Sequence, residues 1–302
     1  MGIPGILYKY FYPNDLTISD SDEYFIEYAP LIDTRHATEH SVLYHNIGDS
    51  ITHAKNADIL LLGNSHVQMG LRGQYIKELA HKLGLKVFYL STGAQRSAFP
   101  LSIIKKYNLS PKIVIVDADI DYFQHVDTVS WITDAYAKQD RWGAYKEYFE
   151  VYIRWHILKH IHAVFPYISL KPIVEHDFII FRSSITGNWF FLHEPKYLKK
   201  IDSSLTMIKA TDEEIGFAMN FKQELDKRHI LLVLTRIPYI NHQTNVESIA
   251  SHLNVPVIIL NIDNLTSNDR GLHLDEKSSQ RFVQSFWHEF IKIPQVGHVL
   301  FP

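Results

Sequence analysis

Cysteine is absent from this 302-residue chain. Disulfide bonds, zinc thiolate sites, iron–sulfur clusters and a cysteine nucleophile are therefore excluded. No stretch approaches the ~18 consecutive apolar residues that a membrane-spanning helix needs, and no internal repeat is visible. The basic excess that many nucleic-acid-binding proteins carry is also missing, since 30 Lys and Arg face 33 Asp and Glu. A nucleic-acid partner is accordingly not expected.

Short apolar runs recur along the chain at residues 57–62, 86–90, 112–116, 230–234 and 255–260. Runs that are apolar throughout are typical of strands buried on both faces of a parallel sheet. Stretches with helical periodicity follow them at residues 67–83, 100–107, 211–225, 248–253 and from 275 onward. One of these opens on a capping box, Thr211-Asp212-Glu213-Glu214. The sequence therefore predicts an α/β fold, a flavodoxin-like three-layer parallel sheet with helices on both faces.

The regular alternation does not extend over the whole chain. Residues 1–55 are expected to be an irregular N-terminal segment, and residues 56–302 to form the α/β domain. Within that domain the pattern breaks at about residues 122–203, which hold Trp131, Trp142, Trp155 and Trp189. We expect this aromatic-rich insertion to lie beside or over the site as a cap, where it would meet a membrane surface or a protein partner.

Polar residues follow the predicted strands at their carboxyl ends. Parallel strands bring those ends to one edge of a sheet, and ligands bind at that edge in open α/β folds. The residues collected there are Gly63-Asn64-Ser65-His66, Gly93-Ala94-Gln95-Arg96, Asp117-Ala118-Asp119-Ile120-Asp121, Thr235-Arg236, and Asp269 with His273. A serine, a glycine turn and a late Asp/His pair are the components of a Ser-His-Asp hydrolytic site.

Two of these segments carry a family resemblance. Gly63-Asn64-Ser65-His66, at the end of an apolar run, resembles the first block of the SGNH/GDSL hydrolase superfamily, in which Gly-Asp/Asn-Ser occupies a strand-to-helix turn. Asp269-Arg270-Gly271-Leu272-His273 is similar to the last block of that family, Asp-x-x-His, with one additional residue. The resemblance covers roughly residues 57–121 and 230–291.

The resemblance implies a serine acyl-ester enzyme. Ser65 would be the nucleophile, His273 the general base, and Asp269 the residue that orients the imidazole. The backbone N–H groups of Ser65 and Gly93 would form the oxyanion hole. The third block of the family, Gly-x-Asn, is replaced here by Asp117-Ala118-Asp119, and an ionised Asp119 would repel an oxyanion.

The resemblance also bears on substrate and location. The Gly-Asn-Ser-His variant is similar to a bacterial, envelope-associated branch whose members add or remove acyl groups on polysaccharides. It implies an acylated carbohydrate or cell-envelope polymer as substrate, no cofactor, and a place in the cell envelope or outside the cytoplasm, with the cytoplasm as the alternative. Residues 1–7 are too short for a signal-peptide core, so any anchor would lie outside this chain.

Several of these residues have a structural alternative. Ser65 could cap the helix that follows it, and Asp119 and Asp121 could end a strand at the solvent edge. A carboxylate at residue 119 could instead bind a cation or sugar hydroxyls. Residues 95 and 96 are also candidates to replace the missing Asn as oxyanion donors. The candidates for substrate contact are Asn64, His66, Gln95, Arg96 and Asp119.

Two histidine patterns invite a metal interpretation. His36-Ala37-Thr38-Glu39-His40 matches the H-x-x-E-H string of inverzincins, but its surroundings lack a long amphipathic helix and an evident third ligand. His156 and His160 share a helix face, with His162 close by. The aromatic and basic residues around that second group fit a surface helix at an interface more simply. We predict a metal at neither place.

Two functions from different classes follow from these observations. The first is a serine-dependent acyl-ester hydrolase or O-acyltransferase acting through Ser65, His273 and Asp269. The second is a non-catalytic binding or assembly protein on the same scaffold, with a glycan or a protein as partner. The missing third-block Asn and the longer Asp-x-x-x-His spacing favour the second.

Overall fold

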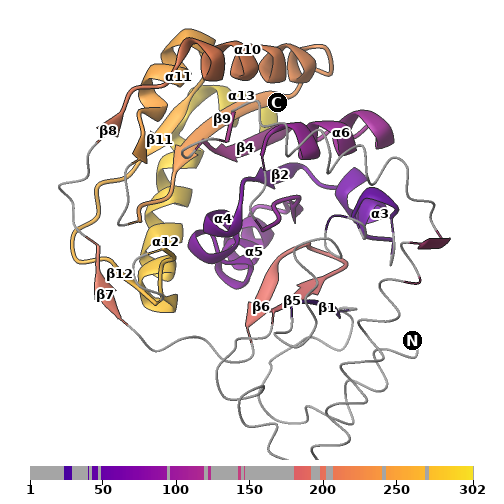
Figure 1. The fold of residues 1–302 in the computed structure, drawn as a ribbon, viewed down its shortest axis with the longest axis horizontal. Coiled ribbons are helices and arrows are strands. Elements are labelled where there is room, and N and C mark those ends of the chain that lie inside the picture. The colour runs from indigo at the N-terminus through magenta and orange to yellow at the C-terminus, as the bar shows by residue number, and fades with distance from the viewer. Residues whose placement is uncertain are drawn as a thin grey trace, which may run out of the picture.

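The computed structural model describes residues 24–28, 40, 43–46, 49–93, 96–118, 122–123, 142–143, 146, 180–191, 198–201, 207–239, 243–268 and 272–301. Its centre is a parallel sheet of five strands in the order β11-β9-β4-β2-β3 (Figure 1). The strands are β2 (Ile59–Leu62), β3 (Val87–Tyr89), β4 (Ile113–Asp117), β9 (Leu231–Arg236) and β11 (Val257–Ile259). Counted along the chain within this sheet, the order is 2-1-3-4-5, the flavodoxin-like arrangement. The predicted fold class is confirmed.

Alternate residues of the central strands face two different helical layers, as the period of two in a strand requires. Leu60, Val114 and Leu232 pack with α3 (Ser50–Lys55), α6 (Ala98–Tyr107), α10 (Asp212–Asp226) and α11 (Val246–Leu253). Ile59, Ile113 and Val233 pack with α4 (Ser65–Gly70), α5 (Gly73–Lys82), α12 (Glu276–Lys292) and α13 (Pro294–Leu300). The sheet is therefore the buried middle layer of three.

Helix α10 begins where its sequence predicts. The Thr211 hydroxyl accepts the Glu214 N–H at 3.2 Å, and the Glu214 carboxylate accepts the Thr211 N–H at 2.7 Å. The helix predicted over residues 67–83, in contrast, is two helices, α4 and α5, and that prediction is wrong. The chain breaks at Leu71, whose fully buried backbone carbonyl accepts the hydroxyl of buried Tyr89. This interaction joins distant residues, so the local periodicity does not reveal the break.

The N-terminal 55 residues were predicted to be irregular, which is wrong for two elements. Strand β1 (Tyr24–Tyr28) pairs antiparallel with β5 (Ile180–Ser183), and α3 occupies residues 50–55. The run Tyr24-Phe25-Ile26-Glu27-Tyr28 is rich in strand-favouring residues, but its partner lies far along the chain, so the sequence does not reveal the pairing. Helix α3 has only six residues, too few for a periodic pattern, and its first-turn Ile51 N–H donates to Asn46 Oδ1 at 2.8 Å in place of a cap by Asp49.

The described part of the predicted insertion contributes no strand to the central sheet. Strands β1, β5 and β6 (Trp189–Phe191) form a separate antiparallel sheet, and β7 (Lys199–Lys200) pairs with β12 (Thr266–Ser267). A further short pair is formed by β8 (Met207–Ile208) and β10 (Gln243–Thr244). Most of the insertion, including Trp131 and Trp155, lies outside the described residues, so its predicted role as a cap or partner surface stays a prediction.

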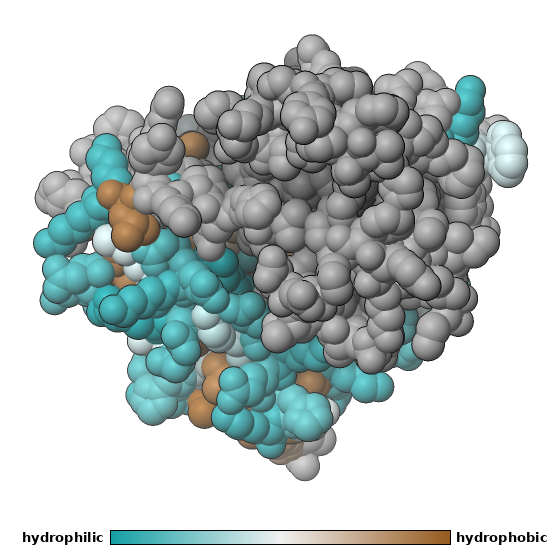
Figure 2. Space-filling view, turned by 90° about the horizontal axis from the view of Figure 1, so that it is seen from below, coloured by the Kyte–Doolittle hydropathy of each residue, from teal (hydrophilic) through white to brown (hydrophobic). Residues whose placement is uncertain are grey.

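The described surface is mainly hydrophilic in the view of Figure 2, with small separate hydrophobic areas. Trp142 is 77% exposed, whereas Trp189 is buried in the hairpin of β5 and β6. Among the helices that the structure describes, none is both long and apolar enough to cross a membrane.

Candidate active site

The turn after β2 carries the candidate nucleophile. Gly63 has a φ of 149°, and a Cβ atom there would lie 2.3 Å from Val67 Cγ2, so the turn accepts only glycine. Asn64 is the N-cap of α4, and its side-chain oxygen accepts the His66 N–H at 2.8 Å. Since Asn64 caps the helix, Ser65 is not its cap, and the structural alternative for Ser65 is wrong. The Ser65 hydroxyl stands at the first helical position, half-buried.

His273 lies in the loop between β12 and α12, and the base of that loop is closed by backbone contacts. The Asn268 N–H donates to the His273 carbonyl at 3.1 Å, and Ser267 forms a β-bridge with Leu274. Asp275 then caps α12 by accepting the Ser278 N–H at 2.7 Å. These contacts fix the position of the His273 backbone.

The structure brings the two predicted residues together. His273 Nε2 and Ser65 Oγ are 2.8 Å apart, although 208 positions separate them in the sequence. Both side chains are half-buried, so a substrate could reach them. An imidazole at this distance can take the hydroxyl proton as the oxygen attacks an electrophile. Ser65 also follows β2, beside the β2–β4 boundary where the strand order reverses and ligands bind in this fold.

Hydrogen bonds between the α4–α5 segment and the start of α12 hold Ser65 and His273 in position relative to each other. The Ser279 hydroxyl donates to the Gly70 carbonyl at 3.1 Å. Arg72 Nη2 donates to the Leu274 carbonyl at 3.4 Å, next to the candidate base. Tyr75 donates its hydroxyl to the Glu276 carboxylate at 3.2 Å. The helix that begins at the serine is thus tied to the helix that follows the histidine.

A second histidine, His66, lies beside the Ser65–His273 pair. The ring of His66 lies 4.5 Å from that of buried Tyr239, and 5.3 Å from the ring of His273 in an edge-on arrangement. His66 is half-buried. It packs locally, and its position beside His273 keeps it a candidate for substrate contact.

Gly93 lies on the loop that neighbours the Ser65 turn. The parallel pairing of β2 with β3 continues beyond both strands, because the Leu90 N–H donates to the Leu61 carbonyl at 3.0 Å and the Thr92 N–H to the Gly63 carbonyl at 3.4 Å. The residue after Thr92 is therefore level with the turn that carries Ser65. Gly93 itself is buried.

The remaining predicted site residues are placed only in part. Arg96 is half-buried, two residues before α6. Asp269, Gln95, Asp119 and Asp121 lie outside the described residues. The predicted role of Asp269 in orienting His273 therefore stays a prediction.

Asp117, the last residue of β4, has a structural role. It is buried, and its Oδ1 accepts the Ile237 N–H at 3.0 Å, which joins the end of β4 to the segment after β9. Burial, and then the charge of Asp117, raise the pKa of Tyr122 well above its ordinary value of 10.0. The Tyr122 phenol therefore stays protonated at physiological pH.

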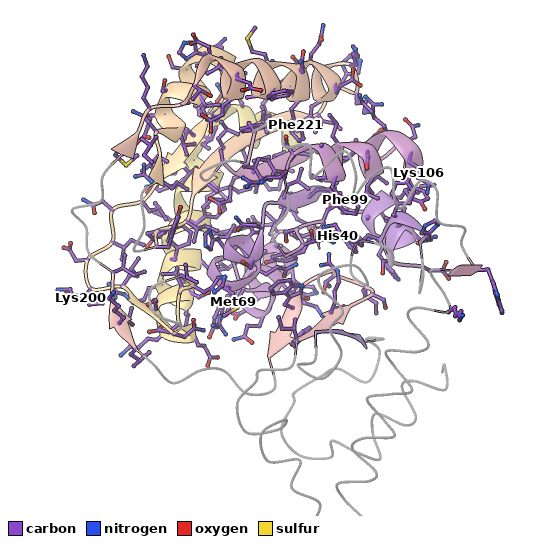
Figure 3. All side chains as sticks on the ribbon, viewed as in Figure 1. His40, Met69, Phe99, Lys106, Lys200 and Phe221 are labelled. Carbon is purple, nitrogen blue, oxygen red and sulfur yellow. The ribbon has the colours of Figure 1, made fainter. Side chains whose placement is uncertain are left out.

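Of the histidines considered for metal binding, His40 is the one that the structure describes. His40 is buried, with its Nε2 3.0 Å from the Thr92 hydroxyl and its ring 4.5 Å from that of Phe99 (Figure 3). Thr92 belongs to the loop of Gly93, and Phe99 belongs to α6. The other members of both patterns, His36, Glu39, His156, His160 and His162, lie outside the described residues. Among the residues that are described, no three or more His, Asp or Glu side chains cluster as metal ligands would.

Sequence reasoning missed two buried polar residues behind the site, Gln68 and Arg182. Gln68 follows Ser65 by three positions on α4, and Arg182 belongs to β5. Each donates to the backbone of the loop that precedes Gly93. Gln68 lies within the stretch predicted to be helical, and Arg182 lies in the predicted insertion. No local sequence pattern marks either residue as part of the site.

Comparison of the chain with protein-family models, with curated proteins and with solved structures finds no match. The fold and the site geometry therefore define an α/β protein with a five-stranded parallel sheet and a Ser–His pair at its carboxyl edge, without assigning it to a family.

Proposed function

We propose that this chain is a serine-dependent acyl-ester enzyme, a hydrolase or O-acyltransferase of the SGNH kind. The observation that carries the proposal is the 2.8 Å separation of Ser65 Oγ and His273 Nε2 at the ligand-binding edge of the sheet. The resemblance of the two segments around these residues supports the same conclusion. The sequence has Asp119 where the third block of the resembled family has Asn, and this difference favours the alternative of a non-catalytic binding protein.

The reaction would proceed through an acyl-enzyme. Ser65 Oγ attacks the acyl carbonyl carbon while His273 Nε2 takes the hydroxyl proton. The tetrahedral intermediate collapses as the C–O bond to the leaving alcohol breaks, and the imidazolium returns its proton to that alcohol. Water, or a sugar hydroxyl in the transfer reaction, then attacks the acyl-enzyme with His273 again as base.

Two backbone groups are suited to bind the developing oxyanion. They would be the N–H groups of Ser65 and Gly93, since the extended β2–β3 pairing brings the loop of Gly93 beside the turn that carries Ser65. A donor of this kind typically contributes ~3 kcal/mol to the transition state. Asp269 would hold the imidazole in the tautomer that leaves Nε2 free to accept the proton.

Labelling with a fluorophosphonate probe tests the proposal directly. We expect wild-type protein to be labelled, Ser65→Ala to be unlabelled, and His273→Ala to react ~10²–10⁴-fold more slowly because the general base is missing. Ser251→Ala is a matched control, since Ser251 is exposed on α11, away from the site. Equal labelling of wild type and Ser65→Ala would overturn the proposal. A non-catalytic binding protein would show neither labelling nor ester hydrolysis.

The substrate class and the location belong to the same proposal. The resemblance favours an O-acylated carbohydrate of a bacterial cell envelope, with the protein located in that envelope. Acetate release from an O-acetylated polysaccharide, compared between wild type and Ser65→Ala, tests the substrate class. Release from a small acetyl ester alone would restrict the enzyme to soluble acyl esters.

A further inference from the structure

The turn of the hairpin of β5 and β6 contacts β3, an edge strand of the central sheet. The Tyr89 N–H donates to the Thr186 carbonyl at 2.8 Å. Gly187 approaches so closely that a Cβ atom there would lie 2.2 Å from the Tyr89 carbonyl oxygen. A segment of the insertion is thus fixed against the strand that leads to Gly93.

Arg182 is the main polar link between this hairpin and β3. Its side chain is 0% exposed. It donates to two backbone carbonyls, those of Tyr89 and Ser91, the latter at 2.8 Å. Carbonyls two residues apart point to the same side of an extended strand, and the planar guanidinium fork is suited to hold both. The backbone of residues 89–91, just before Gly93, is therefore held by a side chain that comes from outside the central sheet.

The Ser91 carbonyl is also bound from the nucleophile's helix. Gln68 Nε2 donates to it at 3.0 Å and to the Gly187 carbonyl at the same distance, while Gln68 Oε1 accepts the Trp189 N–H at 2.9 Å. Helix α4, the hairpin and the loop of Gly93 therefore meet at one carbonyl oxygen. All three elements must keep their relative positions for these hydrogen bonds to form together.

The other end of the same peptide unit is fixed as well. The N–H of Thr92 donates to the Gly63 carbonyl at 3.4 Å, beside the Ser65 turn. The Thr92 hydroxyl is bound to His40 Nε2 at 3.0 Å, and both residues are buried. Thr92, the residue before Gly93, is thus held through its backbone N–H and its side-chain hydroxyl.

From these contacts we propose that Arg182 is a positioning residue for the oxyanion donor on Gly93. The inference rests on the proposed function, because it concerns a donor in the same reaction. A buried arginine is costly unless its donors are used, and an apolar residue would fill this position at lower cost. Arg182 instead fixes the orientation of the peptide group between residues 91 and 92. That peptide group in turn directs the chain toward Gly93. Oxyanion donors must be held within ~0.5 Å of their productive position.

The test separates loss of an oxyanion donor from general loss of structure. Arg182→Met is compared with wild type on a pair of substrates, an ester and the thionoester of the same acyl group. In the thionoester the negative charge develops on sulfur, a poorer hydrogen-bond acceptor than oxygen. We expect kcat on the ester to fall ~10²-fold with KM little changed, while the thionoester rate falls much less. The ester-to-thionoester ratio of kcat/KM should therefore drop.

Three further variants keep the test decisive if Arg182→Met folds poorly. Gln68→Met removes the second donor to the Ser91 carbonyl and should lower the same ratio to a smaller extent. Ile249→Ala opens a cavity under α11, in the opposite helical layer, and should reduce stability while leaving the ratio unchanged. Arg182→Lys retains one donor and should recover part of the ratio.

The outcomes distinguish this inference from the proposed function. An unchanged ratio in Arg182→Met and Gln68→Met, with activity that still requires Ser65, would overturn the positioning role and leave the enzyme assignment intact. Ester hydrolysis that persists in Ser65→Ala would overturn the assignment and the inference with it.

Discussion

Gly63 determines how the chain turns from β2 into the helix that starts at Ser65. Its φ of 149° is unfavourable for side-chain-bearing residues, and the space beside it is filled by Val67, with Asp117 Cβ 3.2 Å from the position of an added Cβ. Gly63→Ala is expected to lower the free energy of unfolding by at least ~1–3 kcal/mol, because strain and a clash add. Urea denaturation followed by circular dichroism measures the change.

Gly216 provides a matched control. It lies inside α10, and nothing is within 4 Å of the position a Cβ would take. Gly216→Ala is expected to raise the free energy of unfolding by ~0.5–1 kcal/mol, since alanine restricts the unfolded chain and favours the helix. Equal effects of the two substitutions would contradict the role given to the Gly63 turn.

The two residues of the candidate site, Ser65 and His273, could be predicted from the sequence, whereas the buried residues behind them could not. Ser65 and His273 each sit next to a local signal, a glycine turn after an apolar run and a polar loop before an amphipathic helix. Arg182 and Gln68 act on a carbonyl far away in the sequence. Such contacts depend on which segments become neighbours in space, and no local periodicity reports that.

Helices α6 and α10 are joined at one carboxylate. Glu224 Oε1 lies 2.6 Å from Lys227 Nζ, and its Oε2 lies 3.3 Å from Lys105 Nζ on α6. The hydrogen bond from Lys227, with the hydrogen bond and charge of Lys105, lowers the pKa of Glu224 from 4.5 to about 2, against desolvation, which raises it. The carboxylate therefore favours the folded state whenever it is ionised.

This shift predicts a pH-dependent contribution to stability. A group whose pKa is lower in the folded state stabilises it fully above the unfolded-state pKa, and the contribution disappears as the pH falls through the folded-state pKa. Glu224→Gln should be slightly less stable than wild type at pH ~7, since exposed pairs are screened. The difference should shrink as the pH falls from 4.5 to about 2.

Urea midpoints measured across that pH range test the prediction. Glu213→Gln is the control, because Glu213 is exposed on the same helix and belongs to its first turn. A stability difference for Glu224→Gln that stays constant from neutral to acidic pH would show that the ion pairs of Glu224 with Lys105, Lys227 and Arg228 contribute nothing.

The elements of the sheet were predicted better than their connections. All five central strands and the capping box of α10 follow from patterns within a few neighbouring residues. The break between α4 and α5 is set by the buried hydroxyl of Tyr89, and β1 exists only through its pairing with β5. Both depend on tertiary contacts, which override local propensity.

Over the whole molecule, the candidate site depends on the docking of α12. That helix buries Phe282, Phe286 and Phe290 against the layer that includes α4. We expect Ser65 to regain reactivity toward a fluorophosphonate only when α12 becomes protected from amide hydrogen exchange during refolding from urea. The reason is that the base arrives with this helix, and contacts between distant residues form late.

Quenched-flow labelling and pulsed hydrogen exchange on the same samples measure the two events. Protection of β2 and β4 is expected to precede or accompany them. Ser65 labelling that appears before α12 is protected, and that is absent in Ser65→Ala, would contradict the dependence on α12.

The 208 positions between Ser65 and His273 also have a consequence for synthesis in the cell. Chains grow at ~5–20 residues per second, so Ser65 is added to the chain ~10–40 s before His273. During that interval the nascent chain carries Ser65 without His273. Translation itself therefore sets the earliest time at which the Ser65–His273 pair can form.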